Sequence, residues 1–314
     1  MKPKWYHLVL VLGAGLLLTG TAVSAQDKPS TVAELALYRG ADRQQILEEG
    51  ARKEGTVNFY TANPDRRFWV SAFKKRYPYI KVMDWRAGVS SLVPRVLEEN
   101  KAGKHRVDIL QLSQAGAIVL RAGGILQPFY SPNLAYLEEG GIREEPGGGV
   151  FLATYRLNPV GVGYNTKMIT RAQLPQSYQD LLDPKWKGKL AIAGSNTGAQ
   201  WIAVILAAHG EDFLKRLAKQ EIQVHMMSGR ALFDMVVAGE YPFSPTLYMS
   251  HAVLSKKMGA PVDWMPLEPT YTLAGQIAID SGGEVRHVMS SSELFLTVIR
   301  NLQKWDWILR FRDP

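Results

Sequence analysis

The sequence predicts an α/β protein built from two doubly wound α/β lobes that are joined by a hinge. Its 314 residues are 46% hydrophobic and 21% charged, a globular composition with enough apolar mass for one large or two medium domains. Short strand-like apolar runs alternate with amphipathic helical patterns along most of the chain. The alternation stops once, over Glu138–Gly149, and then resumes. Such alternation is typical of a largely parallel sheet covered by helices, and the interruption predicts a second lobe.

The first lobe is expected to contain three strand-loop-helix units. The predicted strands are Thr56–Tyr60, Tyr79–Trp85 and Val107–Leu112. The predicted helices are Gln44–Lys53 before them, then Asn63–Arg76, Ser90–Lys101 and Ala115–Ala122. In a doubly wound sheet, ligands gather at the loops beyond the carboxyl ends of the strands. Four polar residues of these loops are predicted to contact a ligand: Thr61, Asn63, Ser90 and Ser113.

Two extended runs, Val150–Tyr155 and Val160–Tyr164, follow the interruption and predict a crossover into the second lobe. The strands expected there are Lys189–Ala193, Ile222–His225 and Pro242–Pro245. The helices expected there are Ser177–Leu182, Ala199–Ala208, Glu211–Lys219, Ala231–Ala238 and Met249–Met258. Val262–Met265 and Tyr271–Ile279 are extended again and are expected to return to the first lobe. Repeated crossing builds a hinge with a cleft beneath it, which is a ligand site by geometry.

The N-terminal segment has the pattern of a cleaved secretory signal. Lys2 and Lys4 precede an apolar run over Leu8–Thr19, and Val23-Ser24-Ala25 offers small side chains at a cleavage point. The run is short for a membrane span, so an uncleaved anchor is the less favoured alternative. We expect a periplasmic protein with a signal peptide over 1–25. The predicted remainder is a first lobe over 26–158 and 266–289, a second lobe over 159–265, and an atypical C-terminal helix over 290–314.

Composition and motifs disfavour several classes of chemistry. Cys is absent, which excludes disulfides, thiolate metal sites and cysteine nucleophiles. The six His show no short metal-ligand spacing, and no nucleophile elbow, Walker loop or dinucleotide fingerprint is present. We therefore expect no catalytic residue, no metal and no cofactor, with an exported hydrolase using scattered acids such as Asp65 and Asp84 as the competing class. The formal net charge of +8 is spread along the chain, which indicates a solvated basic surface and no nucleic-acid partner.

A family resemblance is carried by Asp180-Leu181-Leu182-Asp183-Pro184-Lys185-Trp186-Lys187-Gly188-Lys189-Leu190. This stretch resembles the periplasmic solute-binding proteins of ABC importers, in the branch that includes the ferric-iron binders. Further matches lie in the expected order along residues 41–279. They are Lys53-Glu54-Gly55, Val107-Asp108-Ile109-Leu110, Gly163-Tyr164-Asn165-Thr166, Gly239-Glu240-Tyr241-Pro242 and Gly259-Ala260-Pro261-Val262. The resemblance implies a type II two-lobe fold that closes on a small ligand and delivers it to a permease without catalysis.

The resemblance does not imply an iron site. In the ferric branch a His, a Glu and two adjacent Tyr hold the metal, a hard oxygen and nitrogen set suited to Fe(III). The matching positions here are Asn63, Ser113, Leu247 and Tyr248. One ligand of the four remains, so Tyr248 is predicted either to contact the ligand or to lie in the core with a satisfied hydroxyl.

The resemblance also implies an anion site at the start of a second-lobe helix, where Ser195-Asn196-Thr197-Gly198-Ala199 occupies the matching place. Free N–H groups and the positive end of the helix dipole favour an anion there on physical grounds alone, and Gly198 would let it approach the backbone. The alternative is that Ser195 or Asn196 only caps the helix. Arg230, in the next loop, would add a bidentate partner for carboxylate or phosphate, or would be solvated. Trp201, near the start of the same helix, is predicted to be a core residue.

These observations predict an exported solute-binding protein that captures a small anionic ligand in an interlobe cleft and presents the closed form to an ABC permease. The predicted ligand contacts are Thr61, Asn63, Ser90, Ser113, Ser195, Thr197, Gly198, Arg230 and Tyr248. We expect a small-molecule ligand and the permease as partners, and a monomer. A ferric-iron-binding protein of the same family and an exported hydrolase are the alternatives. After Ile279 the sequence departs from the family pattern.

Overall fold

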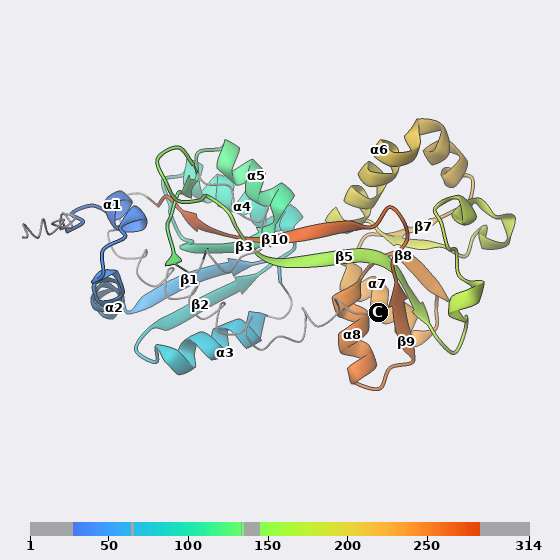
Figure 1. The fold of residues 1–314 in the computed structure, drawn as a ribbon, viewed down its shortest axis with the longest axis horizontal. Coiled ribbons are helices and arrows are strands. Elements are labelled where there is room, and N and C mark those ends of the chain that lie inside the picture. The colour runs from blue at the N-terminus through green and yellow to red at the C-terminus, as the bar shows by residue number, and fades with distance from the viewer. Residues whose placement is uncertain (1–27, 64–65, 133, 135–144, 283–314) are drawn as a thin grey trace, which may run out of the picture.

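The computed structural model describes residues 28–63, 66–132, 134 and 145–282 (Figure 1). The strands are β1 (Thr56–Thr61), β2 (Lys81–Arg86), β3 (Ile109–Ser113), β4 (Leu126–Gln127), β5 (Ala153–Asn165), β6 (Ala191–Ala193), β7 (Gln223–His225), β8 (Phe243–Tyr248), β9 (Val262–Met265) and β10 (Tyr271–Asp280). The α-helices are α1 (Val32–Leu37), α2 (Arg43–Glu54), α3 (Arg66–Arg76), α4 (Val89–Lys101), α5 (Gln114–Ala122), α6 (Asn196–Ala218), α7 (Gly229–Ala238) and α8 (Met249–Lys257). Short 3-10 helices are η2 (Arg171–Gln173), η3 (Gln179–Leu182) and η4 (Pro184–Trp186). The predicted signal peptide and the predicted C-terminal helix lie outside the described residues.

The main sheet is mixed rather than largely parallel. Its strand order is β2-β1-β3-β10-β5-β8, with β4 beside β10 and β9 beside β5. β1 runs parallel to β2 and β3, but β10 runs antiparallel to β3 and β5. The prediction of a largely parallel sheet is wrong at this point because β10 returns from the second lobe, and it therefore enters the first-lobe sheet against the direction of β3.

Two long neighbouring strands connect the lobes. β5 is one continuous strand of 13 residues, where the sequence pattern predicted two separate extended runs. It pairs with β10 from Tyr271↔Val160 to Ile277↔Ala153, and its second half pairs with β8 and β9. Figure 1 shows β5 and β10 running side by side from one lobe to the other. The predicted boundary between residues 158 and 159 therefore falls inside a strand and not in a linker.

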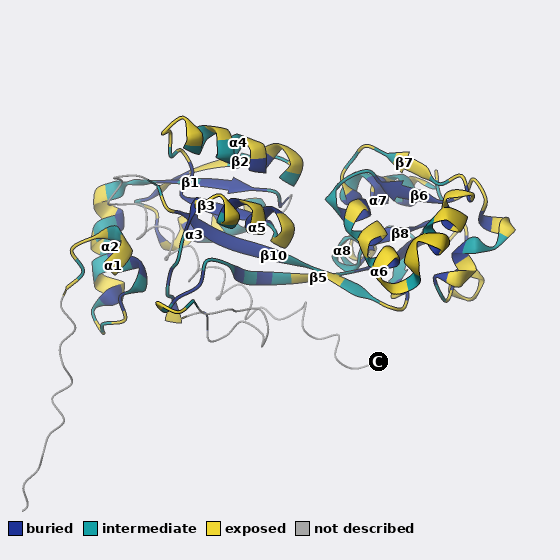
Figure 2. Cartoon of the chain, turned by 90° about the horizontal axis from the view of Figure 1, so that it is seen from above, coloured by how far each residue is buried: buried dark blue, intermediate teal, exposed yellow. Residues whose placement is uncertain are grey.

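Each lobe has its own hydrophobic core, with buried strands beneath more exposed helices (Figure 2). In the first lobe, α1, α2 and α3 contribute to a core that includes Phe59 and Phe73, and α4 and α5 contribute to another around Leu92 and Leu120. The second lobe has corresponding cores, one of which includes Trp201. Helices cover both faces of the first-lobe sheet, as expected for a doubly wound lobe.

Three elements differ locally from the prediction. The helix α1 was not predicted, and it begins at a capping box in which Thr31 and Glu34 satisfy each other's backbone N–H groups. The predicted helix Ser177–Leu182 is the 3-10 turn η3. The predicted helices Ala199–Ala208 and Glu211–Lys219 form one element, α6, which is kinked at Gly210, where φ is 78°. None of the described helices is long and apolar enough to span a membrane.

A buried carboxyl at the start of the third strand gives a testable pH dependence. Asp108 is buried, and its Oδ2 accepts hydrogen bonds from Asn58 N at 2.6 Å and Asn58 Nδ2 at 2.9 Å. Burial raises the pKa of Asp108 to about 6, with a further contribution from the Asp280 charge, although the Asn58 bonds oppose the rise. The unfolded pKa is about 3.9. Between about pH 4 and 6 the folded chain therefore holds more protons, so its stability falls as the pH rises.

Replacing Asp108 with Asn is expected to flatten this fall. Urea denaturation at closely spaced pH values between about 4 and 7.5 measures it, because the slope of unfolding free energy against pH reports the difference in bound protons. The exposed control Asp212→Asn should keep the wild-type slope. If Asp108→Asn retained the full fall, the buried carboxyl would not be its source.

Candidate ligand-binding site

Three helices of the second lobe begin close to one another. Tyr248 occupies the N-cap position of α8. Its hydroxyl lies 2.8 Å from Thr197 Oγ1, in the first turn of α6. A Cβ on Gly229, the first residue of α7, would lie 3.6 Å from the same Thr197 oxygen. The starts of α6 and α7 therefore lie close together at Thr197, and the Tyr248 side chain reaches the same place from the start of α8. Helix starts favour an anion.

Two polar atoms beside this junction are buried with no hydrogen-bond partner among the described residues. They are Ser195 Oγ and His251 Nδ1. Ser195 occupies the N-cap position of α6, but its side chain makes no capping bond, whereas Ser228 Oγ caps α7 by accepting from Ala231 N. The His251 ring lies 5.0 Å from the Tyr248 ring. We call Ser195, Thr197, Tyr248 and His251 the second-lobe cluster. A buried polar atom without a partner is costly, so a ligand oxygen would be stabilising here.

The protonation states of the cluster suit an anion. Burial raises the pKa of Tyr248 above its usual value, so its phenol stays protonated at neutral pH and can donate a hydrogen bond. Burial, together with the nearby Arg230 and Arg156 charges, lowers the pKa of His251 to about 3. The imidazole is therefore neutral at neutral pH and can still donate one N–H. Tyr271, whose hydroxyl donates to the Thr197 carbonyl at 3.4 Å, also has its pKa raised by burial.

Gly198 and Arg230 have contacts within the lobe. A Cβ on Gly198 would lie 1.9 Å from the Ala193 carbonyl oxygen, so this glycine lets α6 pack directly on β6. Glycine is required here because a side chain would collide with the backbone of β6. This reason differs from the predicted one, which was the approach of an anion to the backbone. Arg230 Nη2 pairs with Asp234 at 2.6 Å, and Arg230 Nη1 donates to Ser255 at 3.1 Å. These bonds hold Arg230 between α7 and α8.

The predicted first-lobe contacts lie at the ends of β1 and β3 and at the start of α4. Thr61 is buried and donates to Gln111 Oε1 at 2.6 Å, and it accepts from Asn63 N at 2.9 Å. Asn63 is buried as well. Ser113 caps α5 by accepting from Gly116 N at 3.4 Å. Ser90 is exposed in the first turn of α4. Thr61 and Ser113 thus make hydrogen bonds that stabilise the fold.

Sequence reasoning missed three residues of the crossover strand. Tyr155, Arg156 and Asn158 lie on β5, where the pattern predicted the end of one strand and a break. Asn158 is buried and accepts at Oδ1 from Ser250 Oγ at 3.3 Å, which ties β5 to the start of α8. The signal that could have found them is the polar residues spaced by two along an otherwise apolar extended segment.

Three of the four positions that match the iron ligands of the ferric branch hold other side chains here. Leu247 is fully buried in a second-lobe core, so it turns away from the cluster beside Tyr248. Asn63 and Ser113 replace the imidazole and the carboxylate. Among the described residues, no group of three or more His, Asp or Glu is placed to hold a metal ion.

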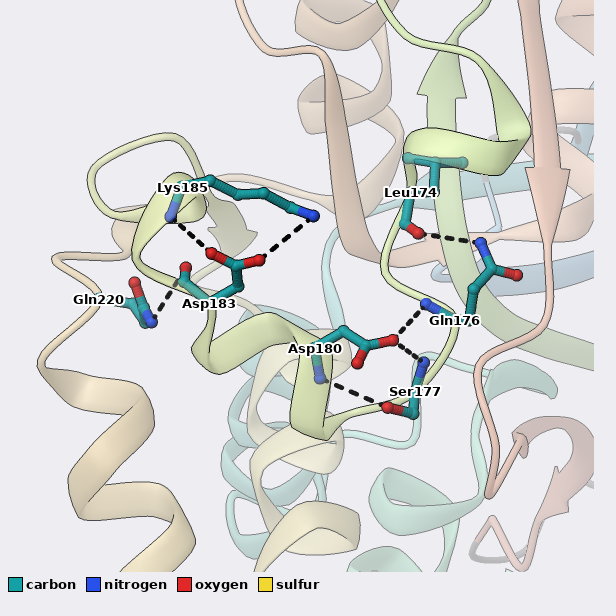
Figure 3. Close-up of polar contacts among 7 residues, drawn as sticks. All are labelled: Leu174, Gln176, Ser177, Asp180, Asp183, Lys185 and Gln220. Carbon is teal, nitrogen blue, oxygen red and sulfur yellow. Dashed lines mark hydrogen bonds and ion pairs between the residues drawn. The ribbon is translucent and has the colours of Figure 1, made fainter.

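The stretch with the clearest family resemblance has a structural role (Figure 3). Asp180 Oδ2 accepts from the backbone N–H groups of Gln176 and Ser177 at 2.8 and 3.0 Å. Asp183 caps η4 by accepting from Lys185 N at 2.9 Å, and its carbonyl accepts from Gln220 Nε2 at 3.4 Å. These bonds stabilise the turns that lead into β6. The motif therefore indicates the fold and gives no information on where a ligand binds.

Two lobes joined by paired crossover strands define a periplasmic-binding-protein fold of type II. Residues 121–269 match the family of bacterial extracellular solute-binding proteins. The Fe(3+)-binding periplasmic protein of Serratia marcescens is 28% identical over 180 residues, which are 57% of this chain and 51% of the relative. The chain spans about half the length of the curated relatives it matches.

Solved structures share the fold at low sequence identity. AfuA from Actinobacillus pleuropneumoniae with exogenous fructose-6-phosphate bound matches with a TM-score of 0.68 and 21% identity, over 80% of this chain and 82% of that one. Iron-bound HitA from Pseudomonas aeruginosa matches with a TM-score of 0.66 and 17% identity, over 78% of this chain and 84% of that one. The chain is therefore similar to bacterial extracellular solute-binding proteins, and among these to ferric-binding periplasmic proteins. The family is non-enzymatic and periplasmic or extracellular, which removes support from the hydrolase alternative.

Proposed function

We propose that the protein captures a small anionic solute between its lobes and delivers it to an ABC permease without converting it. The observation that carries the proposal is the cluster at Thr197, where the starts of α6 and α7 and the Tyr248 hydroxyl meet beside two buried polar atoms that lack partners among the described residues. Backbone N–H groups, hydroxyls and a neutral imidazole would surround the anion from the second lobe.

Closure would complete the site. The proposed moving bodies are the first lobe over 26–158 and 266–289 and the second over 159–265, with β5 and β10 bending between them. First-lobe contacts are proposed from Thr61, Asn63, Ser90 and Ser113. A ligand that contacts both lobes favours the closed form by its differential affinity, and the permease would then receive that form.

The relatives suggest two kinds of solute, and the residues favour one. AfuA is described with fructose-6-phosphate and the Serratia relative as an Fe(3+)-binding protein. In this chain three of the four iron positions have become Asn63, Ser113 and Leu247, whereas the helix starts that suit a phosphate or carboxylate are present. We therefore propose a phosphorylated or carboxylated compound and take fructose 6-phosphate as the first probe.

A thermal-shift screen followed by titration calorimetry tests the proposal. The screen should contain sugar phosphates, inorganic phosphate, carboxylates, amino acids, polyamines and ferric citrate. An anionic compound at 100 times its Kd should add about 2.7 kcal/mol to the unfolding free energy, and mass spectrometry should recover it unchanged. Conversion of the bound compound, or binding of cations alone, would contradict the proposal.

The variant Tyr248→Phe separates the anion and iron alternatives. Loss of one hydrogen bond to an anion should cost about 1 kcal/mol, or about fivefold in Kd. The matched control Tyr241→Phe removes a hydroxyl that contacts His225 at 2.8 Å outside the cluster and should leave the Kd unchanged. Tight Fe(III) binding that Tyr248→Phe abolishes would instead favour a phenolate metal site.

A further inference from the structure

We propose that Arg156, on the crossover strand β5, is the charged residue that anchors the anionic group of the solute. The inference rests on the proposed function. It adds the residue that determines the charge specificity of the site. It also names the class of group that this residue recognises, which is an oxyanion such as a phosphate monoester. Arg230, the residue that the sequence favoured for this role, is assigned a structural role.

The pleat of β5 places Arg156 on the face that carries the cluster. Tyr248 is directly opposite Val160 in the antiparallel β5–β8 pair, and directly opposed residues share a face of the sheet. Side chains on one face recur every two residues, so Arg156 and Asn158 share this face with Val160 and Tyr248. Residues 156 and 160 are separated by about 13 Å along the strand. The long side chains of Arg156 and Tyr248 can therefore approach one another over Asn158.

A second contact confirms which side of β5 faces the helix starts. Ser250, in the first turn of α8, donates to Asn158 Oδ1 at 3.3 Å. The start of α8 therefore lies over the β5 face that carries Arg156. The Arg156 guanidinium is also close enough to oppose the rise in the pKa of Tyr248 that burial causes, and to contribute to the low pKa of His251. His251 Nδ1 and Ser195 Oγ, which have no hydrogen-bond partner within the described part of the chain, belong to the same cluster.

The two candidate arginines differ in their place in the fold. Arg230 makes an ion pair of 2.6 Å with Asp234 and a bond of 3.1 Å with the buried Ser255, so its charge is compensated within the second lobe. Arg156 lies on the strand that joins the lobes and is half-buried, with its guanidinium 5.6 Å from the Tyr155 ring centroid. An anion held there would touch the hinge strand and the second lobe together. The planar fork of Arg binds two oxygens of one group, which suits phosphate or carboxylate.

Titration calorimetry of four proteins tests the assignment: wild type, Arg156→Ala, Arg156→Lys and Arg230→Ala. The probes are fructose 6-phosphate, inorganic phosphate and citrate, with fructose as the uncharged control and any further compound found by the screen. We expect Arg156→Ala to weaken binding of the anions by about tenfold or more, because a hydrogen bond to a charged group is lost. Arg156→Lys should lie between Arg156→Ala and wild type, and Arg230→Ala should stay within about threefold of wild type. Circular dichroism and the Tm report whether each variant folds.

The outcomes distinguish this inference from the proposed function. If an anion binds wild type and Arg156→Ala equally well, or if Arg230→Ala is the damaging change, the assignment of Arg156 is wrong and anion capture stands. If a neutral or cationic compound binds and no anion does, both are overturned. If Arg156→Ala does not fold, Arg156→Lys decides, because wild-type affinity in that variant would contradict the requirement for a guanidinium fork.

Discussion

Replacing Trp201 with Ala is expected to destabilise the protein by about 3 to 5 kcal/mol, the usual cost of removing a large buried aromatic side chain. Trp201 is 1% exposed and belongs to a second-lobe core, as the sequence predicted. Its ring lies 6.5 Å from that of Tyr178, which connects α6 to the segment before η3. The loss should therefore loosen α6, whose start carries Ser195 and Thr197.

Denaturation with urea measures this effect as a fall in the midpoint at unchanged slope. The neighbouring Ile202 is 41% exposed on the same helix, so Ile202→Ala is a matched control that should cost far less. Equal losses in the two variants would contradict a core role for Trp201.

Gly198→Ala is expected to destabilise the second lobe and to disturb the cluster. The added Cβ would lie 1.9 Å from the Ala193 carbonyl oxygen, and that neighbour is backbone, which cannot turn aside. Either α6 shifts away from β6 or β6 distorts, at a cost of about 1 to 3 kcal/mol or more. Because Thr197 precedes Gly198, the same shift should lengthen its 2.8 Å contact with Tyr248 and weaken anion binding.

Gly147→Ala is the control, because a Cβ there meets no atom within 4 Å and the backbone needs no positive φ. It should leave both the Tm and the affinity near wild type. If Gly198→Ala were as stable as this control, the close packing of α6 on β6 would not be what requires glycine.

Periodicity predicted most elements of the fold, because burial of one face imposes the helical or strand repeat directly on the sequence. The strands β1, β2 and β3 and the helices α4 and α5 begin and end within about two residues of their predicted bounds. Periodicity could not predict which strands pair with one another or in which direction. Val150–Tyr155 and Val160–Tyr164 belong to one strand because β10 pairs with β5 from Tyr271 to Ile277, and the antiparallel sense of β10 depends on its return from another lobe.

The site was harder to predict because a hydroxyl in a loop has several uses. Ser113 and Thr61 are polar loop residues in the expected places, and both make structural bonds. Ser195 was weighed as a helix cap, yet its hydroxyl makes no capping bond. Arg230 follows a Ser-Gly pair that starts a helix, and only the fold shows Asp234 and Ser255 beside it. Arg156 was missed because its face of β5 is defined by the partner strand β8.

Small-angle X-ray scattering with and without a saturating anionic ligand tests the central claim, that two lobes close on a small solute. The radius of gyration is expected to fall on binding and to recover when the ligand is removed by dialysis, with the ligand chemically unchanged. An unchanged radius of gyration at saturation, with binding confirmed by calorimetry, would contradict capture by closure.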